Sequence, residues 1–276
     1  FEEIKMRRDN PIVYSIDKVQ ECLYKEPLGI PLIGDTQTMS SLNREKIVGW
    51  FNKTYSPNNL ILGVVGDADF KDIVQFAEKN FGIKKSKISE LKISKQLSSK
   101  IENRKGIDQA SLIFCYHSPL FSEKNSTASR VLLTLMTGGM SSRLFSEIRE
   151  KKNLAYAIKG DMESNNYFAH SLVYVGTTKE NVSEVKKLIL EEFKKVSEEI
   201  DEDELNQIKE QMIGNYQISM EDSQNQMMNL LMHELNGNAE EFYEVEKNIL
   251  NVKLEEVKEL AKKVLKEHSF FVLEPK

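Results

Sequence analysis

The chain has 276 residues, of which 40% are hydrophobic and 29% are charged, and its formal net charge is −5. This is the composition of a soluble globular protein, and the length allows two domains. The negative charge disfavours nucleic acid as a partner, and no apolar run approaches the roughly 20 residues that span a membrane. Cys22 and Cys115 lack a C-x-x-C spacing, which disfavours a disulfide framework or a cysteine-based zinc site. We therefore expect a cytoplasmic protein with reduced thiols.

The first third of the chain contains helical patterns with clear start signals. Helices are predicted at residues 1–25, 43–55 and 69–81. The first is expected to kink or restart at Pro11, because proline fits the first turn of a helix but not its interior. Asn43 or Ser41 can cap the second helix, and Asp69 can cap the third. The intervening stretch NLILGVVGD, residues 59–67, is predicted to be a strand.

Two stretches have the composition of connections. KEPLGIPLIGDTQTMSS, residues 25–41, contains prolines and glycines that favour a loop. Residues 83–99 are rich in lysine and serine and poor in large apolar side chains, which is typical of a linker.

The remainder of the chain groups strands before helices. Strands are predicted at residues 109–119, 153–164, 166–177 and 269–275. Helices are predicted at residues 123–137, 141–152, 179–199, 202–219, 222–236, 239–250 and 253–267. This order indicates layers of an α+β fold and not an alternating parallel sheet.

An internal repeat is indicated by two segments that each predict a helix followed closely by a strand. NREKIVGWFNKTYSPNNLILGVV aligns with KLEEVKELAKKVLKEHSFFVLEP at a constant offset, so that Ile47 matches Val257 and Leu60 matches Phe270. Such units are common, and chance similarity remains an alternative. If the repeat is real, about 110 residues that complete the first half are expected upstream.

No complete metal or phosphate motif is present in the sequence. The four histidines are His117, His170, His233 and His268, and they form no H-E-x-x-H or H-x-x-E-H pattern. We interpret each of them as structural, with His233 on a methionine-rich helix face, MMNLLMHEL, that is expected to be packing core. The glycine-rich stretches lack the G-x-G-x-x-G and Walker patterns, and no serine nucleophile elbow occurs.

The stretch GGMSSRLFSEIREKKNLAYAI, residues 138–158, remains as a candidate for function. Two glycines end one helix, a second helix carries Arg149 near its end, and Tyr156 begins a strand. Taken on these residues alone, the pattern favours a plain connection with a solvated arginine and a half-buried tyrosine.

This stretch closely resembles the second-domain signature of the pitrilysin-type, or insulinase-type, zinc metallopeptidases, which include insulin-degrading enzyme and the mitochondrial and bacterial processing peptidases. EEIKMRRDNP, PLGIPLIGD and FNKTYSPNNLILGVVGD resemble the latter part of the first domain of that family, and DQASLIFCY resembles the entry strand of its second domain. The similarity extends through essentially the whole chain in the family's order.

The resemblance implies two homologous α+β halves of the processing-peptidase-like metallohydrolase fold, which face each other across a closed chamber. Residues 1–95 would be the latter part of the zinc-side domain with its linker, and residues 96–276 the non-zinc, substrate-contacting domain. The family binds Zn²⁺ through an inverted H-x-x-E-H helix, which this sequence does not contain, and through a later glutamate. That glutamate matches Glu3, with Glu2 as the less favoured neighbour.

The resemblance also assigns roles to Arg149 and Tyr156 as catalytic and substrate-binding residues. A tyrosine hydroxyl can stabilise the negative charge that develops on a carbonyl oxygen during peptide hydrolysis. An arginine offers a fixed fork of donors for a substrate carbonyl. The seven-residue spacing between the two residues matches the family pattern.

Three functional hypotheses follow. The chain could be part of a zinc endopeptidase that cleaves peptides or unfolded segments, inactive by itself because it would keep only one of three zinc ligands. It could instead be a non-catalytic scaffold that pairs with an active partner, or a plain peptide-binding domain. The expected partners are a peptide substrate, a segment or chain that carries the metal motif, and a second subunit in a homodimer or heterodimer.

Overall fold

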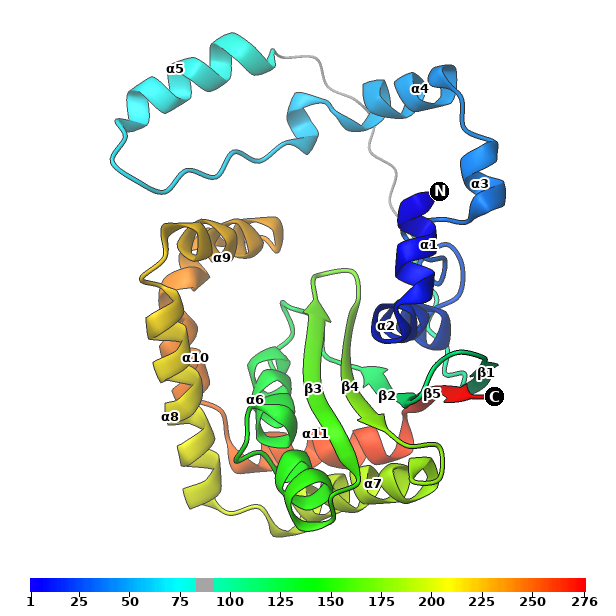
Figure 1. Cartoon of the computed structure of the whole chain (residues 1–276). Coiled ribbons are helices and arrows are strands. Elements are labelled where there is room, and N and C mark those ends of the chain that lie inside the picture. The colour runs from blue at the N-terminus through cyan, green and yellow to red at the C-terminus, as the bar shows by residue number, and fades with distance from the viewer. Residues whose placement is uncertain (83–91) are drawn as a thin grey trace. The chain divides into compact units, whose positions relative to one another are not determined.

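The computed structural model describes residues 1–82 and 92–276, which form two compact units (Figure 1). The first unit comprises Phe1–Gly34, Ile93–Ile213 and Glu246–Lys276, and the second comprises Asp35–Lys92 and Gly214–Val245. Most of the predicted linker, up to residue 91, lies outside the described residues. The domain division between residues 95 and 96 concerns homologous sequence segments and stays a prediction.

A five-stranded mixed sheet forms the centre of the first unit (Figure 1). Its strands are β1 (Lys100–Arg104), β2 (Ala110–His117), β3 (Ala155–Ser164), β4 (Ala169–Thr177) and β5 (Ser269–Pro275). They lie in the order β1, β5, β2, β4, β3, with β1 parallel to β5 and all other neighbours antiparallel. Four of these strands confirm the sequence prediction, whereas β1 was not predicted, because KIENR contains a single large apolar residue.

Helices cover both faces of this sheet (Figure 1). On one face α6 (Ser126–Thr137), α7 (Val182–Glu199) and α11 (Leu254–Lys266) share a core with Leu112, Phe114 and Tyr116 of β2. On the other face α2 (Pro11–Leu23) packs against the alternate residues Ile113 and Cys115. Alternate side chains of a strand point to opposite faces, so β2 is buried on both sides. The layered arrangement confirms the predicted α+β fold class.

The edge strand β3 lies in very close contact with α6. A Cβ atom placed on Gly160 of β3 would be 2.0 Å from Oγ1 of Thr137 and 3.0 Å from Cδ1 of Leu133. Only glycine allows this approach without moving the helix or the strand. The contact fixes the middle of β3 against the helical layer.

The other elements of the first unit are α1 (Glu2–Asp9), the π-helix η2 (Phe145–Lys151) and most of α8 (Glu202–Ser219) and α10 (Val245–Leu250). The predicted restart at Pro11 is confirmed, because the Asn10 side chain accepts hydrogen bonds from the backbone N–H groups of Ile12 and Val13 at 3.1 and 3.2 Å. α8 begins in the first unit and ends in the second.

The second unit is built from short helices. They are α3 (Thr36–Ser40), α4 (Arg44–Thr54), η1 (Pro57–Asn59), α5 (Phe70–Phe81), α9 (Ser223–Leu235) and η3 (Ala239–Glu244). Asn43 caps α4 and Asp69 caps α5, as predicted. α4 and α11 begin at Arg44 and Leu254, which matches the helical part of the predicted repeat.

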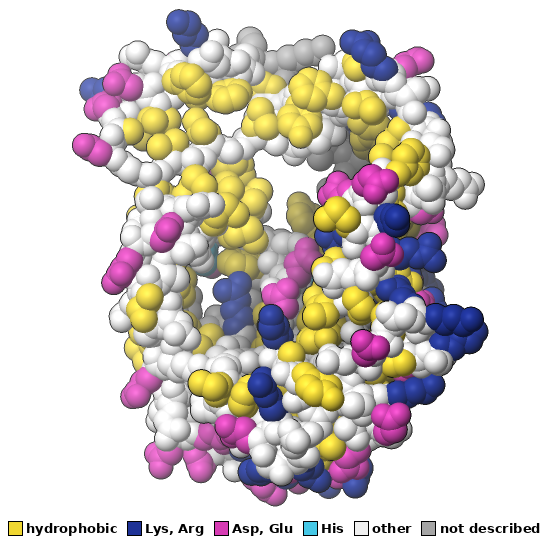
Figure 2. All heavy atoms as spheres, viewed as in Figure 1, with side chains coloured by type: hydrophobic (Ala, Val, Ile, Leu, Met, Phe, Trp, Pro, Cys, Tyr) yellow, Lys and Arg dark blue, Asp and Glu magenta, His cyan; other side chains and the backbone are white. Residues whose placement is uncertain are grey.

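Residues 59–67 do not form the predicted strand. A strand needs a hydrogen-bonded neighbour, and no described segment pairs with this one. Its side chains Leu60, Ile61 and Leu62 are exposed, and hydrophobic side chains are visible at the surface of the α4–α5 segment (Figure 2). The methionine-rich face of α9 is likewise less buried than predicted, since Met228 and Met232 are exposed.

Within residues 1–82 and 92–276, no helix combines the length and the apolar character that a membrane span requires.

Candidate functional site

Glu3 lies in the first turn of α1 and is exposed. The helix has acidic residues at its start and Arg7 and Arg8 at its end, an arrangement that complements the helix dipole. The Arg7 guanidinium donates hydrogen bonds to both carboxylate oxygens of Asp17 on α2, at 3.1 and 2.5 Å. This paired contact holds α1 against α2 and so sets the place of the Glu3 carboxylate.

A cleft of about 420 Å³ opens beside Glu3 within the first unit. Its charged lining comes from α1 and α2 on one side and from the β3–β4 pair on the other. The titratable residues that line it are Glu3, Arg7, Asp17, Asp161, Glu163 and His170. Four carboxylates against one guanidinium make the cleft acidic, so a cationic or hydrogen-bond-donating group is the chemistry that it favours.

His170 lies at the base of this cleft and is almost completely buried. Its Nδ1 is 3.4 Å from the hydroxyl of Tyr24, and its Nε2 is 3.9 Å from a carboxylate oxygen of Glu163. Burial, followed by the nearby His117, lowers the pKa of His170 to about 4. Burial and the neighbouring Asp161 raise the pKa of Glu163. At neutral pH the imidazole of His170 is therefore neutral.

The buried imidazole makes stability depend on pH. Because the pKa of His170 is about 4 in the folded chain and about 6.5 in an unfolded one, the unfolded state binds the proton first as pH falls. We expect His170 to have no effect above pH ~6.5, and to lower the free energy of unfolding by ~1.4 kcal/mol per pH unit down to pH ~4, roughly 3 kcal/mol in all. Urea unfolding of the wild type and of His170→Gln at several pH values measures this.

The difference between the free energies of unfolding of the two proteins, taken at each pH, separates the contribution of His170 from those of its titrating neighbours. Glu163 acts in the opposite direction, because its raised pKa makes the folded state bind the proton more readily. The lowered pKa of His117 acts in the same direction as His170, but both neighbours remain in the variant. Parallel stability curves for the two proteins between pH 7 and 4 would contradict the prediction.

Arg149 lies on a π-helix, a rare geometry that occurs frequently at functional sites. η2 is anchored by Leu144 and Ile148, which are completely buried. Arg149 is exposed, and its guanidinium carbon is 5.0 Å from the centre of the Phe145 ring. The stacked ring limits the motion of the guanidinium and leaves its donors available to a ligand.

Tyr156 is the extra residue of a β-bulge at the start of β3. Ala155 pairs with Thr177 and Ala157 pairs with Gly176, so Tyr156 has no partner on β4. Its side chain is 55% exposed. A bulge redirects a side chain out of the regular alternation of a strand, and bulges are over-represented next to active sites.

The structure does not bring all three predicted site residues into one cleft. Glu3 lines the cleft described above, whereas Arg149 and Tyr156 do not. β3 connects the two places, because Tyr156 is at its start and Glu163, near its end, lines the cleft. About 20 Å of strand separates Ala157 from Glu163.

The residues of the described chain do not by themselves fit a zinc site. Structural and catalytic zinc sites take three or four nitrogen, sulfur or oxygen ligands from the protein. No group of three histidine, cysteine or acidic side chains with metal-binding geometry occurs in residues 1–82 and 92–276. Glu3 could supply one ligand, and the others would have to come from elsewhere.

Sequence reasoning missed the other cleft residues. Asp161 and Glu163 lie two residues apart on a strand, a spacing that puts both carboxylates on one face and that could have pointed to them. His170 lies opposite Glu163 in the β3–β4 pair, and the adjacency of these two predicted strands could have pointed to it as well. No sequence signal connects the Arg7–Asp17 pair with β3, because that placement depends on how α2 packs on the sheet.

Comparison with known proteins gives consistent matches. The Peptidase M16 inactive domain matches residues 41–212. An uncharacterized zinc protease of Rickettsia felis is 30% identical over 80% of this chain and 54% of its own length. The uncharacterized zinc protease YmxG of Bacillus subtilis is 28% identical over 97% of this chain and 66% of its own length. The chain thus spans about half to two thirds of these relatives.

Solved structures share the fold at low sequence identity. A protease from Helicobacter pylori superimposes with a TM-score of 0.87 at 21% identity, covering 99% of this chain and 69% of that one. A peptidase M16 inactive domain from Pseudomonas fluorescens gives a TM-score of 0.83 at 18% identity, covering 100% of this chain and 68% of that one. A chain of complex III2 from Candida albicans gives a TM-score of 0.90 at 17% identity, covering 99% of this chain and 69% of that one.

Proposed function

Because this chain belongs to the family of the peptidase M16 inactive domain, we propose that it provides the substrate-contacting part of a zinc-dependent endopeptidase, together with one zinc ligand but without the H-x-x-E-H helix. The observation that carries the proposal is the backbone geometry at the two positions that the resemblance singles out. The two residues that resemble the family's substrate-contacting pair, Arg149 and Tyr156, lie on a π-helix and on a β-bulge. Both irregularities are characteristic of functional sites.

The proposed substrate is a peptide or an unfolded segment of a protein. The guanidinium of Arg149 holds a backbone carbonyl of the substrate through its fixed fork of donors. The hydroxyl of Tyr156 donates a hydrogen bond to the carbonyl oxygen on which negative charge develops. In a complete enzyme, Zn²⁺ would act as a Lewis acid on the same carbonyl, with Glu3 as one of its ligands.

The separation between Glu3 and Tyr156 favours a dimer as the active form. In one copy about 13 Å of strand separates Ala157, next to Tyr156, from Asp161, the first residue of β3 that lines the Glu3 cleft, and neither Tyr156 nor Arg149 lines that cleft. A second subunit with the same fold could present its Arg149 and Tyr156 to the cleft of the first. A homodimer is the simplest such assembly, and a heterodimer with a metal-carrying partner meets the same requirement.

A non-catalytic scaffold is the second candidate function. The name of the matched domain, an inactive domain, supports it, as does the lack of three metal ligands among the described residues. In that case the chain would stabilise or present substrate to an active partner, and its Arg149 and Tyr156 would contribute to binding alone. Cytoplasmic localisation remains a proposal for both functions.

The test is peptide cleavage by the full-length gene product that carries this chain. We expect it to cleave an unstructured fluorogenic peptide, and we expect a chelator to abolish cleavage and added Zn²⁺ to restore it. The 276-residue chain alone serves as the control and is expected to leave the peptide intact. A metal-loaded, folded full-length protein without any cleavage, but with peptide binding, would favour the scaffold.

A further inference from the structure

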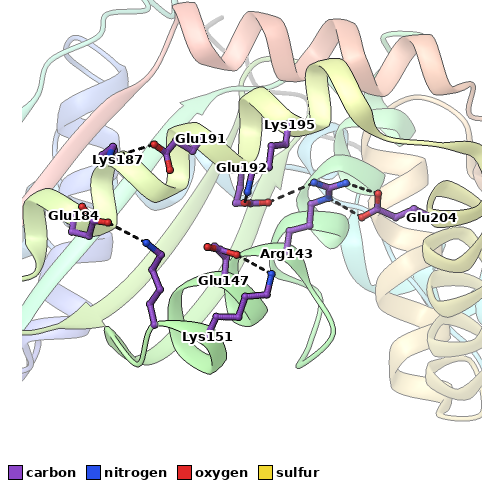
Figure 3. Close-up of polar contacts among 10 residues, drawn as sticks. Arg143, Glu147, Lys151, Glu184, Lys187, Glu191, Glu192, Lys195 and Glu204 are labelled. Carbon is purple, nitrogen blue, oxygen red and sulfur yellow. Dashed lines mark hydrogen bonds and ion pairs between the residues drawn. The ribbon is translucent and has the colours of Figure 1, made fainter.

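The guanidinium of Arg143 is held by carboxylates from two different helices (Figure 3). Its Nε and Nη2 donate hydrogen bonds to the two carboxylate oxygens of Glu204 on α8, at 2.7 and 2.5 Å. Its Nη1 is 3.5 Å from a carboxylate oxygen of Glu192 on α7. Arg143 lies two residues before η2 begins at Phe145, so this contact joins the segment that enters η2 to both helices.

The cluster is partly buried: Arg143 and Glu192 lie inside it, whereas Glu204 and Lys195 reach the surface. The side chain of Arg143 is 19% exposed and that of Glu192 is 5% exposed. Lys195 completes the neutralisation of Glu192 with an Nζ–Oε1 distance of 2.5 Å. Partly buried pairs with a bidentate fork are screened less by salt than surface pairs, and they fix orientation as well as distance.

α8 holds the same segment at a second point. The side-chain amide of Gln211 donates a hydrogen bond to the carbonyl of Gly138 at 2.5 Å. Glu204 and Gln211 are seven residues apart, which places them on one face of α8. The turn between α6 and η2 is therefore attached to α8 at its beginning, through Gly138, and at its end, through Arg143.

The attachment continues from Arg143 to both candidate site residues. The side chains of Leu144 and Ile148 are completely buried and anchor η2 at its start and in its middle. The backbone N–H of Asn153 donates to the carbonyl of Arg149 at 3.1 Å, and that of Leu154 donates to the carbonyl of Ile148 at 2.9 Å. Leu154 is two residues before Tyr156, so the path from the ion cluster to the β-bulge is short and hydrogen-bonded.

We propose that Arg143, held by Glu204 and Glu192, is the positioning residue that fixes Arg149 and Tyr156 for substrate. Arg143 does not contact substrate in this scheme. It fixes the angle at which η2 leaves α6, and with it the direction of the Arg149 guanidinium and the entry of the chain into β3. The inference rests on the proposed function for the roles of Arg149 and Tyr156, whereas the attachment itself can be tested without substrate.

The first experiment measures hydrogen exchange in the 276-residue chain. Arg143→Lys keeps the charge but removes the fork, and Glu204→Gln keeps one acceptor without the charge. Both are expected to speed exchange of the amides of Asn153 and Leu154 by about tenfold, with β4 amides unchanged. Glu191→Gln is the matched control, because its pair with Lys187 on the same helix is exposed and 3.6 Å long (Figure 3), and it is expected to leave these amides unchanged.

The second experiment measures cleavage by the full-length gene product. We expect Arg143→Lys to lower kcat by about tenfold through the displaced Tyr156, since small displacements of catalytic groups have effects of this order, and to raise KM through the displaced Arg149. In a Tyr156→Phe background the same substitution is expected to cause no further loss of kcat, because both changes remove the same interaction of the Tyr156 hydroxyl. If Arg143 only stabilised the fold, the factors by which the two single substitutions lower kcat would multiply in the double variant.

The outcomes separate this inference from the proposed function. Unchanged exchange at Asn153 and Leu154 overturns it, whatever the activity of Tyr156→Phe. Multiplicative losses in the double variant also overturn it. If Tyr156→Phe retains full activity, the proposed function fails, and the exchange experiment still decides whether Arg143 fixes the segment.

Discussion

Replacing Tyr156 by phenylalanine is expected to lower kcat for peptide cleavage by the full-length gene product by about 10²-fold, with little change in KM. The hydroxyl would act on charge that develops only in the transition state, so its loss leaves ground-state binding intact. The ring stays in place, and the 55% exposed side chain has little packing to lose. Steady-state kinetics with an unstructured peptide measure both constants.

The matched control for this substitution is Tyr167→Phe. Tyr167 is also exposed and lies in the connection between β3 and β4, so it loses the same hydroxyl at a place without a proposed role. It is expected to keep wild-type kinetics. An increase in KM with unchanged kcat in Tyr156→Phe would assign the hydroxyl to substrate binding and remove it from catalysis.

A complementation experiment decides whether Tyr156 acts in its own subunit or in a partner. Separately, Glu3→Gln is expected to be inactive and Tyr156→Phe to keep about 1% of the wild-type activity, as the 10²-fold lower kcat implies. If a second copy supplies the tyrosine, co-expression of the two variants forms mixed dimers with one complete site, and random assembly restores about a quarter of the wild-type activity. If each chain uses its own tyrosine, no mixed dimer contains a complete site, and activity stays at the level of the separate variants.

The sequence predicts most of the helices because their signals are local. Asn10, Asn43 and Asp69 cap the helices that follow them, as their positions before apolar patterns indicate. The strands β2 and β4 are mostly apolar and are buried along nearly their whole length, which is the pattern of strands covered on both faces. These features depend on neighbouring residues alone, so one sequence is enough to find them.

Features that depend on distant partners could not be predicted from the same patterns. β1 is a polar edge strand that exists because β5 pairs with it. NLILGVVGD has a good strand pattern but no paired neighbour among the described residues, and it stays irregular. Strand formation is a property of the pair, and propensity is only a weak guide to it.

The candidate site shows the same limit. The resemblance pointed to Arg149 and Tyr156. It could not show that they lie on a π-helix and on a β-bulge, because neither irregularity produces a recognisable period in the sequence. Both insert one residue into a regular element, so they shift a pattern without erasing it. The placement of Glu3 in a cleft that Tyr156 does not line depends on the packing of α1 and α2, which no local signal encodes.

Phe114→Ala is expected to have the largest effect on stability, lowering the free energy of unfolding of the first unit by about 3–5 kcal/mol. Phe114 is completely buried in β2, and its ring centre lies 5.1 to 5.7 Å from those of its neighbours Phe193, Phe270, Tyr116 and His268. Removing the ring leaves a cavity between the sheet and the α7–α11 layer that these aromatic side chains cannot fill without leaving their rotamers. Urea unfolding followed by circular dichroism measures the loss.

Two further variants test whether the loss comes from the cavity. Phe70→Ala removes the same atoms from a side chain that is 78% exposed on α5, and it is expected to change stability by less than about 0.5 kcal/mol. Phe114→Leu fills part of the cavity and should fall between the wild type and Phe114→Ala. If Phe114→Ala and Phe70→Ala were equally mild, the aromatic cluster would not be the centre of the core. Since η2 is anchored in the same core through Leu144 and Ile148, its exchange protection would then have to come from the Arg143 cluster alone.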